Sequence, residues 1–332
     1  MREILIEKNQ AGQRFDKYLK KLLCGANSSF IYKMLRKKNI VLNGKKSEGA
    51  EKLKEGDKVT LFFSQETFEK FTASETESFR IQNLPKIKKD KLPFQVLYET
   101  RDILIINKPS GMLSQKGEKG DISANEYILS YLLLTGSIRE TEFATFRPSV
   151  CNRLDRNTSG ILIAGKTLKG LQEMSENLKN RSLKKYYYAL VKGEVSGRCR
   201  LKGYLIKDEK TNRVYVSKKP DTGQEKPIET EYEPIITKNQ ATLLNIHLIT
   251  GRSHQIRAHL SATGHPIIGD PKYGDREVNE RYKKQYQITS QLLHARSLIL
   301  EDGREIIAPL PKDFTRILGE ENGIWQPGIP EV

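Results

Sequence analysis

The chain has 332 residues, of which 37% are hydrophobic and 30% are charged. This length predicts about two domains, and the hydrophobic share is sufficient for packed cores, which excludes a chain that is disordered throughout. Lysine and arginine number 57 against 41 acidic residues, and the resulting net charge of +16 favours a polyanionic partner.

The apolar stretches and the cysteines exclude further classes of protein. The longest apolar stretch, residues 127–134, is far shorter than the ~18 residues that a membrane-spanning helix needs. The first residues carry acids and lack the long apolar region of a secretory signal. Three cysteines without a Cys-x-x-Cys pair predict neither a disulfide framework nor a zinc knuckle. We therefore expect a protein of the reducing cytoplasm that makes no contact with a membrane.

The positive charge is concentrated near the N-terminus. Ten basic residues and a single acid, Asp16, lie between Arg14 and Lys46. A solvated basic face is the alternative interpretation, but this density favours nucleic acid, because each contact with a phosphate releases counterions.

The same segment predicts a small module of helices and strands. An apolar stripe over residues 12–23 has helical spacing, and Ser28 or Ser29 can cap a second helix. Residues 39–45 and 58–63 predict short strands, the first of which ends in an Asn43-Gly44 turn.

Residues 13–63 resemble the S4 domain, an RNA-binding module. The resemblance is carried by four segments, Arg14–Leu19, Ile31–Lys37, Val41–Lys45 and Leu53–Val59. It implies that exposed basic side chains contact RNA: Arg14, Lys17, Lys33, Arg36, Lys37 and Lys45. We expect an S4-like domain over residues 1–64, a polar linker over 65–92, a larger domain over 93–320 and a C-terminal tail over 321–332.

Short β-type runs recur in the larger domain. They lie at residues 94–98, 103–107, 161–166, 186–193 and 241–250, and residues 168–178 form an amphipathic helical pattern. Ser253 can cap another helix that ends near Gly264. Because strands outnumber helices and do not alternate with them regularly, we predict an α+β fold with a mixed, largely antiparallel sheet.

Several common chemistries lack their motifs. The sequence contains no Gly-x-Gly-x-x-Gly after a strand, no P-loop and no Gly-x-Ser-x-Gly. His254 and His259 are five residues apart, which is wrong for two zinc ligands on one helical face. We expect no metal site, and either histidine to orient a loop or a neighbour.

Two polar clusters lie between the apolar strands. Residues 153–160 place Asp155 in a turn before a buried strand, where it is either a reactive carboxylate or a residue that bonds backbone amides. Residues 250–259 place His254 and Arg257 on one side of a helix. Arg257 is a surface residue or a cation that meets the carboxylate and favours its ionised form.

These clusters resemble the signature of the RluA-type pseudouridine synthases. Arg153–Thr167 matches its central block, and four further blocks occur in family order between residues 94 and 310: Lys108–Gly111, Lys185–Gly193, Thr250–Leu260 and Gly264–Gly274. One departure is Asn152, where the family usually has histidine.

The resemblance implies a reaction that converts uridine in RNA to pseudouridine without a cofactor or a metal. It assigns Asp155 to nucleophilic or charge-stabilising catalysis at C1′ of the sugar or C6 of the base. Tyr187 is expected to stack on the base and assist proton removal from C5, Arg257 to pair with Asp155, and Arg153 to brace the flipped-out state. Lys108 and Lys185 either contact phosphates or only close a turn or a strand end.

The S4-like domain in this family implies 23S rRNA or a precursor of the large ribosomal subunit as the substrate, bound by a monomer. The same chemistry on tRNA and a non-catalytic assembly factor that binds rRNA are the alternatives. An S4 domain joined to a methyltransferase is disfavoured, because no Gly-rich turn for the methyl donor is present.

Overall fold

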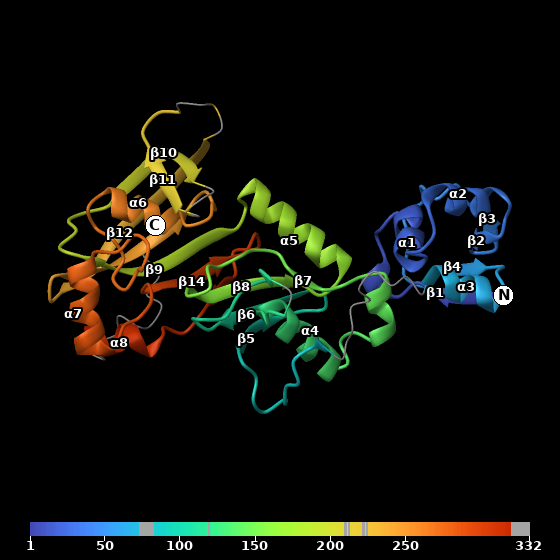
Figure 1. Ribbon diagram of the computed structural model, residues 1–332, viewed down its shortest axis with the longest axis horizontal. Coiled ribbons are helices and arrows are strands. Elements are labelled where there is room, and N and C mark those ends of the chain that lie inside the picture. Colours follow the sequence, from blue (N-terminus) through green and yellow to red (C-terminus); the bar gives the residue numbers. More distant parts are fainter. Residues whose placement is uncertain are drawn as a thin grey trace.

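The larger domain is built on one sheet, and a small N-terminal module lies beside it (Figure 1). The computed structural model describes residues 1–319, except for 73–82, 119, 209–210, 212, 221–222 and 224. The expected tail at residues 321–332 lies outside the described residues, and so does the middle of the expected linker.

The N-terminal module combines a four-stranded antiparallel sheet with helices. The sheet has the order β1-β4-β2-β3, and its strands and helices are β1 (Arg2–Leu5), α1 (Phe15–Leu22), α2 (Ser28–Arg36), β2 (Ile40–Leu42), β3 (Lys45–Lys46), β4 (Lys58–Leu61) and α3 (Gln65–Thr72). Its two predicted helices and its Asn-Gly hairpin are present. Asn43 and Gly44 have φ of 51° and 72°, the positive values that this two-residue turn requires.

Two local expectations for this module differ from the structure. The cap of α2 is Asn27, whose side chain accepts a hydrogen bond from the Phe30 amide, and not Ser28 or Ser29. Residues 65–72, which the sequence places in the linker, form α3, and Phe68 is buried in the core of the module. A helix of two turns with few apolar residues has too short a pattern to be recognised as amphipathic.

The larger domain has an eleven-stranded sheet with the order β11-β10-β12-β13-β9-β14-β8-β6-β5, in which β15 pairs with β14 and β7 with β8. β14 runs parallel to β8, and the other pairings between named strands of the described chain are antiparallel. The strands are β5 (Gln95–Glu99), β6 (Ile103–Lys108), β7 (Ser149–Val150), β8 (Ser159–Gly165), β9 (Lys184–Lys192), β10 (Cys199–Asp208), β11 (Arg213–Ser217), β12 (Lys226–Lys238), β13 (Ala241–Leu248), β14 (Leu293–Ile299) and β15 (Glu305–Ile307). The predicted α+β class with a mixed, largely antiparallel sheet is confirmed.

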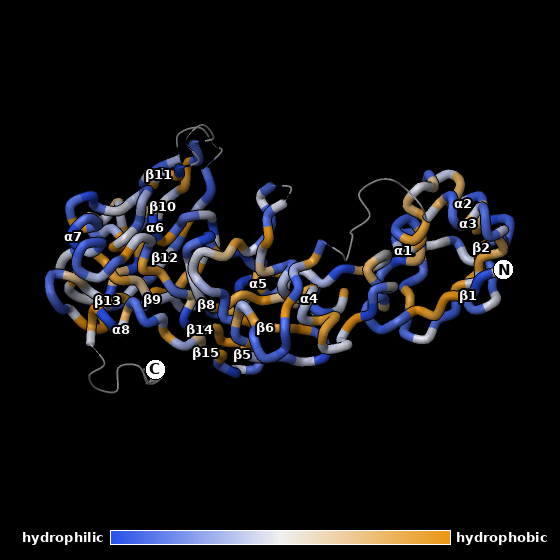
Figure 2. The backbone as a smooth tube through the Cα atoms, turned by 60° about the horizontal axis from the view of Figure 1, so that its bottom comes forward, coloured by the Kyte–Doolittle hydropathy of each residue, from blue (hydrophilic) through white to orange (hydrophobic). Residues whose placement is uncertain are grey.

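Helices pack around this sheet. They are α4 (Ala124–Leu134), α5 (Leu168–Asn180), α6 (Gln255–Ala262), α7 (Arg276–Tyr286) and α8 (Lys312–Leu318). The main apolar core joins β6, β8, β9 and β14 to α4, and α4 contains the longest apolar stretch of the sequence. Figure 2 shows apolar positions gathered along the sheet and polar positions along α7. In the part of the chain that the structure describes, no helix is long and apolar enough to cross a membrane.

Polar side chains join the N-terminal module to the larger domain. Asn9 donates to the Glu142 carboxylate at 2.5 Å, and Gln10 donates to the Thr145 hydroxyl at 2.6 Å. These four side chains are buried, and Arg139 adds an exposed ion pair to Glu7 at 2.9 Å. The two units are therefore in direct contact through hydrogen bonds in this structure.

Candidate active site

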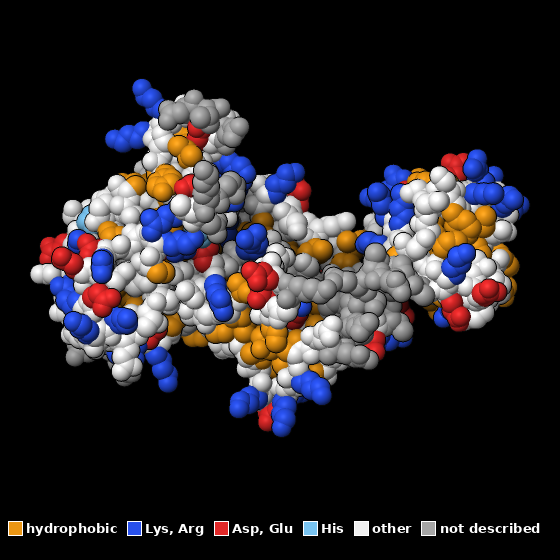
Figure 3. Space-filling view, viewed as in Figure 1, with side chains coloured by type: hydrophobic (Ala, Val, Ile, Leu, Met, Phe, Trp, Pro, Cys, Tyr) orange, Lys and Arg blue, Asp and Glu red, His pale blue; other side chains and the backbone are white. Residues whose placement is uncertain are grey.

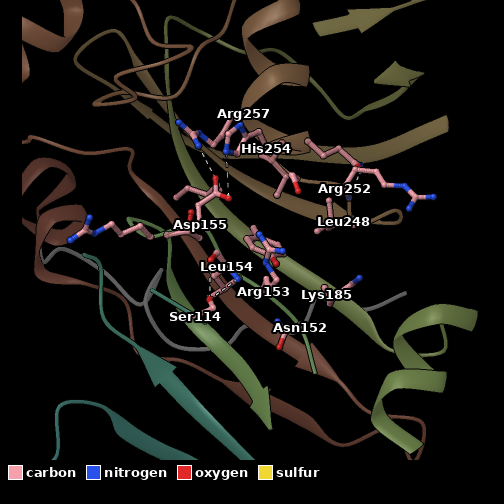
Figure 4. Close-up of a pocket in the computed structure, with 18 of the residues that line it drawn as sticks. Ser114, Asn152, Arg153, Leu154, Asp155, Lys185, Leu248, Arg252, His254 and Arg257 are labelled. Atoms are coloured by element: carbon pink, nitrogen blue, oxygen red, sulfur yellow. Dashed lines mark hydrogen bonds and ion pairs between the residues drawn. The ribbon is translucent and has the colours of Figure 1, made fainter. Parts of the chain in front are cut away.

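A cleft of about 1090 Å³ opens over the centre of the sheet. Its walls are the loop that precedes β8, the end of α5, the start of β9 and the segment that leads from β13 into α6. The two predicted polar clusters, residues 153–160 and 250–259, face each other across it (Figure 4). Residues about 100 positions apart in the sequence are thus brought into contact.

The loop before β8 is held in place on both sides of Asp155. The backbone N–H of Leu154 donates to the Ser114 hydroxyl oxygen at 3.0 Å, and that hydroxyl donates to the Leu154 carbonyl at 2.9 Å. After the loop, Gly160 has φ of 106° where β8 meets β14, and a Cβ there would lie 2.2 Å from the Ala295 carbonyl oxygen. Only glycine fits this close approach, so Asp155 stands at a fixed point beside the sheet.

Arg257 divides its guanidinium between two carboxylates. Its Nη1 donates to Asp155 Oδ2 at 2.7 Å, while its Nε and Nη2 form a fork to Asp270 at 2.7 and 2.8 Å. Asp270 is buried, and it also accepts the backbone N–H groups of Lys272 and Tyr273. Asp270 therefore holds the guanidinium through Nε and Nη2, and Nη1 contacts Asp155. The Asp155 side chain remains partly exposed to the cleft.

The start of α6 differs from the sequence expectation. The helix is preceded by His254 at the cap position, without a side-chain capping bond, so Ser253 is not the cap. Instead, the Gln255 side chain accepts the Arg252 N–H at 3.1 Å and the Thr250 hydroxyl at 2.8 Å. This side chain reaches back to close the turn, and the left-handed backbone at His254 directs its imidazole into the cleft.

Tyr187 lies on β9 at the floor of the cleft. It pairs in register with Ile246 on β13 and with Ala295 on β14, and its side chain is buried. Burial, followed by the charge of Asp155, raises the pKa of the Tyr187 phenol. The ring is therefore a neutral surface at pH 7, next to the carboxylate.

The cleft is strongly basic. Its lining holds nine lysine and arginine side chains and, among the described residues, one carboxylate, that of Asp155. Figure 3 shows lysine and arginine side chains gathered over this face of the larger domain and on the N-terminal module. The cations of the lining are Lys116, Arg153, Arg156, Lys179, Arg181, Lys185, Arg252, Arg257 and Lys272.

Two of these cations, Arg153 and Lys185, are RNA contacts predicted from the sequence, and both line the cleft. Arg153 is exposed and lies two residues before Asp155. Lys185 is half-buried at the start of β9, and burial, together with the neighbouring charge of Arg181, lowers its pKa. A half-buried ammonium with a second cation beside it favours the approach of an anion.

Lys108 stabilises a turn from a buried position. Its side chain is fully buried, and Nζ donates to the carbonyls of Pro109, Met112 and Arg156 at 2.9, 2.7 and 3.1 Å. Burial lowers the pKa of Lys108 to about 7. A side chain enclosed in this way cannot reach a phosphate, which corrects its placement among the RNA-contacting residues and leaves the alternative, a lysine that closes a turn.

The basic residues of the N-terminal module are on its surface. Arg14 forms a two-point contact with Asp16, both distances being 3.1 Å. The other expected RNA contacts are exposed on α1, on and just after α2, and on β3: Lys17, Lys33, Arg36, Lys37 and Lys45. None of these residues lines the cleft, and Figure 1 shows α1, α2 and β3 apart from β9 and α6.

Asn152, the departure from the family pattern, bonds the backbone of β8. Its Oδ1 accepts the Ile163 N–H at 2.8 Å, and it also lines the cleft. Within the described residues, no group of three His, Cys, Asp or Glu side chains is arranged to hold a metal ion.

Sequence reasoning did not assign Asp270 and Tyr273. Tyr273 packs against the Arg257 guanidinium, with the ring centroid 5.1 Å away, and bonds the His254 ring. Both residues lie within Gly264–Gly274, a block that matches the family without indicating a role for any of its members. The match of this block to the family is the feature of the sequence that could have pointed to these two residues.

Comparisons with known proteins identify a family and close relatives. The family model described as RNA pseudouridylate synthase matches residues 102–262. The chain is 32% identical over 319 residues to ribosomal large subunit pseudouridine synthase C of Vibrio parahaemolyticus, covering 94% of each chain. It is 32% identical over 302 residues to the protein of that name from Escherichia coli, covering 89% of this chain and 87% of that one.

Solved structures share the fold. The human protein RNA pseudouridylate synthase domain containing 4 superposes with a TM-score of 0.55 and 22% identity, over 68% of this chain and 91% of that one. The corresponding values for domain containing 1 are 0.53 and 21%, over 68% and 87%. With one third of the residues identical along almost its whole length to curated relatives, the chain belongs to the RluA-type group of the RNA pseudouridylate synthase family.

Proposed function

We propose that this enzyme isomerises specific uridines of 23S rRNA to pseudouridine, with Asp155 as the essential carboxylate. The observation that carries the proposal is the Asp155–Arg257 pair, joined at 2.7 Å in a cleft where other ionisable side chains are mostly cations. The choice of rRNA is supported by relatives named for the large ribosomal subunit, which match along almost the whole chain. Ribosomal RNA as the substrate places the enzyme in the cytoplasm.

The reaction rearranges one nucleotide without gain or loss of atoms. The bond between N1 of uracil and C1′ of ribose breaks, the base turns within the site, and C5 bonds to the same C1′. The proton leaves C5, and N1 gains one. Asp155 stabilises or traps the electron-poor carbon, which is C1′ or C6, as carboxylates do in glycoside hydrolysis. Arg257 fixes the direction from which this carboxylate acts.

Tyr187 and Arg153 are proposed to hold the rearranging nucleotide. The buried ring of Tyr187 offers a flat apolar face next to Asp155, on which the base stacks. The raised pKa keeps its hydroxyl protonated, so the hydroxyl assists removal of the C5 proton as a hydrogen-bonding group and not as a phenolate. Arg153 stands exposed at the cleft, where a guanidinium can occupy the gap that the extruded base leaves. Base flipping costs a few kcal/mol and is cheapest at unpaired sites, which favours loops of the RNA.

The N-terminal module is proposed to be an S4-like RNA-binding domain. Its α1 and α2 expose lysines and arginines, and such side chains recognise backbone and shape more than base identity. The structure extends this module to Thr72 through α3. We propose that the enzyme acts as a monomer, in which one chain carries both the cleft and the N-terminal module.

The test is to map pseudouridine in 23S rRNA and tRNA from cells that lack the gene, complemented with the wild type or with Asp155→Asn. We expect particular rRNA positions to lose the modification and only the wild type to restore it. Restoration by Asp155→Asn would refute the catalytic assignment. Loss at a tRNA position alone would refute the substrate, and no change in either RNA, once redundant enzymes are deleted, would favour a binding-only protein.

A further inference from the structure

His254 has a backbone conformation that its side chain does not favour. Its φ is 57°, in the left-handed region, directly before α6. Residues other than glycine adopt this conformation uncommonly, although histidine does so more often than most, and such residues cluster at functional sites. Here the conformation turns the imidazole away from the helix and into the cleft, beside Asp155 (Figure 4).

One ring nitrogen of His254 is held by Tyr273. Nδ1 lies 3.0 Å from the Tyr273 hydroxyl oxygen, and that oxygen accepts the backbone N–H of Val214 at 2.9 Å. The hydroxyl accepts from Val214 and has its own hydrogen available to donate to Nδ1, which is the direction that we infer. In this arrangement Nδ1 is an acceptor, and the proton of a neutral ring resides on Nε2.

The other ring nitrogen faces the catalytic carboxylate. Nε2 lies 3.9 Å from Asp155 Oδ1, whereas Arg257 contacts the second oxygen, Oδ2, at 2.7 Å. Two donors, one at the N-cap of α6 and one in its first turn, thus face the two oxygens of one carboxylate. A separation of 3.9 Å is longer than a hydrogen bond, but catalytic hydrogen bonds are often long in the free enzyme and shorten when substrate binds.

We propose that His254 is a positioning residue that donates Nε2–H to Asp155 Oδ1 in the RNA complex and so fixes the rotation of the carboxylate. The inference rests on the role proposed for Asp155. The charged groups that face the ring are Asp155, Arg257, Lys272 and Asp270, and Tyr273 bonds it. Burial is the largest influence and lowers the pKa of His254, which is consistent with a neutral ring at pH 7.

Substitutions can separate this role from that of a spacer in the turn. His254→Gly removes the ring and accepts the left-handed backbone without strain. His254→Gln places an amide N–H near the position of Nε2. His247→Gln is the matched control, because His247 is a half-buried imidazole on β13 that stacks on Tyr186 and does not line the cleft. Thermal melts establish that each variant is folded.

The measurement is the single-turnover rate at saturating enzyme, together with the RNA dissociation constant. We expect His254→Gly to lower the rate by about 10- to 100-fold, the scale of a misplaced catalytic group, and to leave RNA affinity within about three-fold. We expect His254→Gln to recover a large part of the rate, and His247→Gln to remain within about two-fold of the wild type. Such a loss in rate without a loss in affinity is not expected from a spacer.

Two outcomes would overturn the inference. Full turnover in a folded His254→Gly would show that the ring is dispensable, and a His254→Gln no better than His254→Gly would show that its donor does not matter. Asp155→Asn in the same assay separates this failure from that of the proposed function. If Asp155→Asn is active, the catalytic assignment fails, whereas an inactive Asp155→Asn with a fully active His254→Gly removes only the role of His254.

Discussion

Asp270 contacts neither the cleft nor, in our mechanism, the RNA, yet it determines where Arg257 can act. Its buried carboxylate accepts two N–H groups of the guanidinium and two of the backbone, and so it is fully partnered. With its Nε and Nη2 bonded to Asp270, Arg257 contacts Asp155 through Nη1. The second oxygen of Asp155, Oδ1, is thereby left to face His254.

We predict that Asp270→Asn lowers stability and slows turnover more than it weakens RNA binding. Removal of one partner of a buried ion pair leaves the other charge uncompensated, which costs about 3 kcal/mol in the free energy of unfolding. Denaturant unfolding and single-turnover rates measure the two effects. The matched control is Asp275→Asn, which affects a partly exposed ion pair with Lys192 and should cost less than about 1 kcal/mol. Equal effects of the two substitutions would contradict the anchoring role.

Asp155, Tyr187 and Arg257 could be selected from the sequence because each lies in a contiguous motif of recognisable type. The pairing of Asp155 with Arg257 could also be expected, and it is present at 2.7 Å. Asp270 could not be assigned, because its partner is 13 residues away and no periodic pattern connects them. The phosphate contact suggested for Lys108 failed for a related reason, since complete burial of a lysine by three carbonyls depends on tertiary packing.

At the level of elements, strands and helices with strong periodicity were predicted well and their ends were not. α5 and β13 cover the ranges expected from their apolar patterns. The caps of α2 and α6 were each displaced by one residue or more, because several polar residues near a helix start are equivalent by composition. Contacts with other parts of the fold determine which of them becomes the cap. For α6 these are the contacts of Gln255 with the Arg252 N–H and of Tyr273 with His254.

The end of α5 and the start of β9 form one side of the cleft and carry two of its cations. Arg181 ends α5 in a left-handed conformation, and Lys185 follows on β9. Neither is joined to a carboxylate in an ion pair of the described chain. We interpret this edge as the place where a phosphate next to the target uridine binds.

We predict that Lys185→Gln and Arg181→Gln each reduce the salt dependence of RNA binding. Loss of one phosphate contact should lower the slope of log affinity against log salt by about 0.7–0.9, with the rate at saturation little changed. Lys284→Gln, on the exposed side of α7 and outside the cleft lining, is the control and should keep the wild-type slope. Unchanged slopes for both cleft variants would show that this edge does not bind phosphate.

On the scale of the whole molecule, the division into a small basic module and a larger α+β domain could be predicted from composition and periodicity. Their mode of contact could not, because it depends on buried hydrogen bonds from Asn9 and Gln10, which carry no sequence pattern. These bonds hold the basic surface of α1 and α2 at a set position relative to Asp155. RNA that occupies both surfaces must therefore match this separation.

We predict that the triple variant Lys33→Gln, Arg36→Gln, Lys37→Gln weakens binding of 23S rRNA without changing the rate on saturating RNA. These three exposed side chains lie at the end of α2, and their loss should lower the salt slope by about 2–3 if each contacts a phosphate. Filter binding across a salt series measures this. A slope equal to that of the wild type would mean that the face of α2 is not used for rRNA.

The position of β14 has a consequence for the synthesis of the enzyme. The strands β5 to β8 and β9 to β13 form two halves of the sheet, and β14 is the strand that pairs with both, through β8 and β9. Residues Leu293–Ile299 leave the ribosome after the strands of both halves. Until then each half presents an unpaired edge, and the wall that bears Asp155 is not joined to the walls that bear Tyr187 and Arg257. We therefore expect the nascent chain to be inactive until β14 has been made, and a chain that stops before β14 to aggregate through these edges and to have no activity.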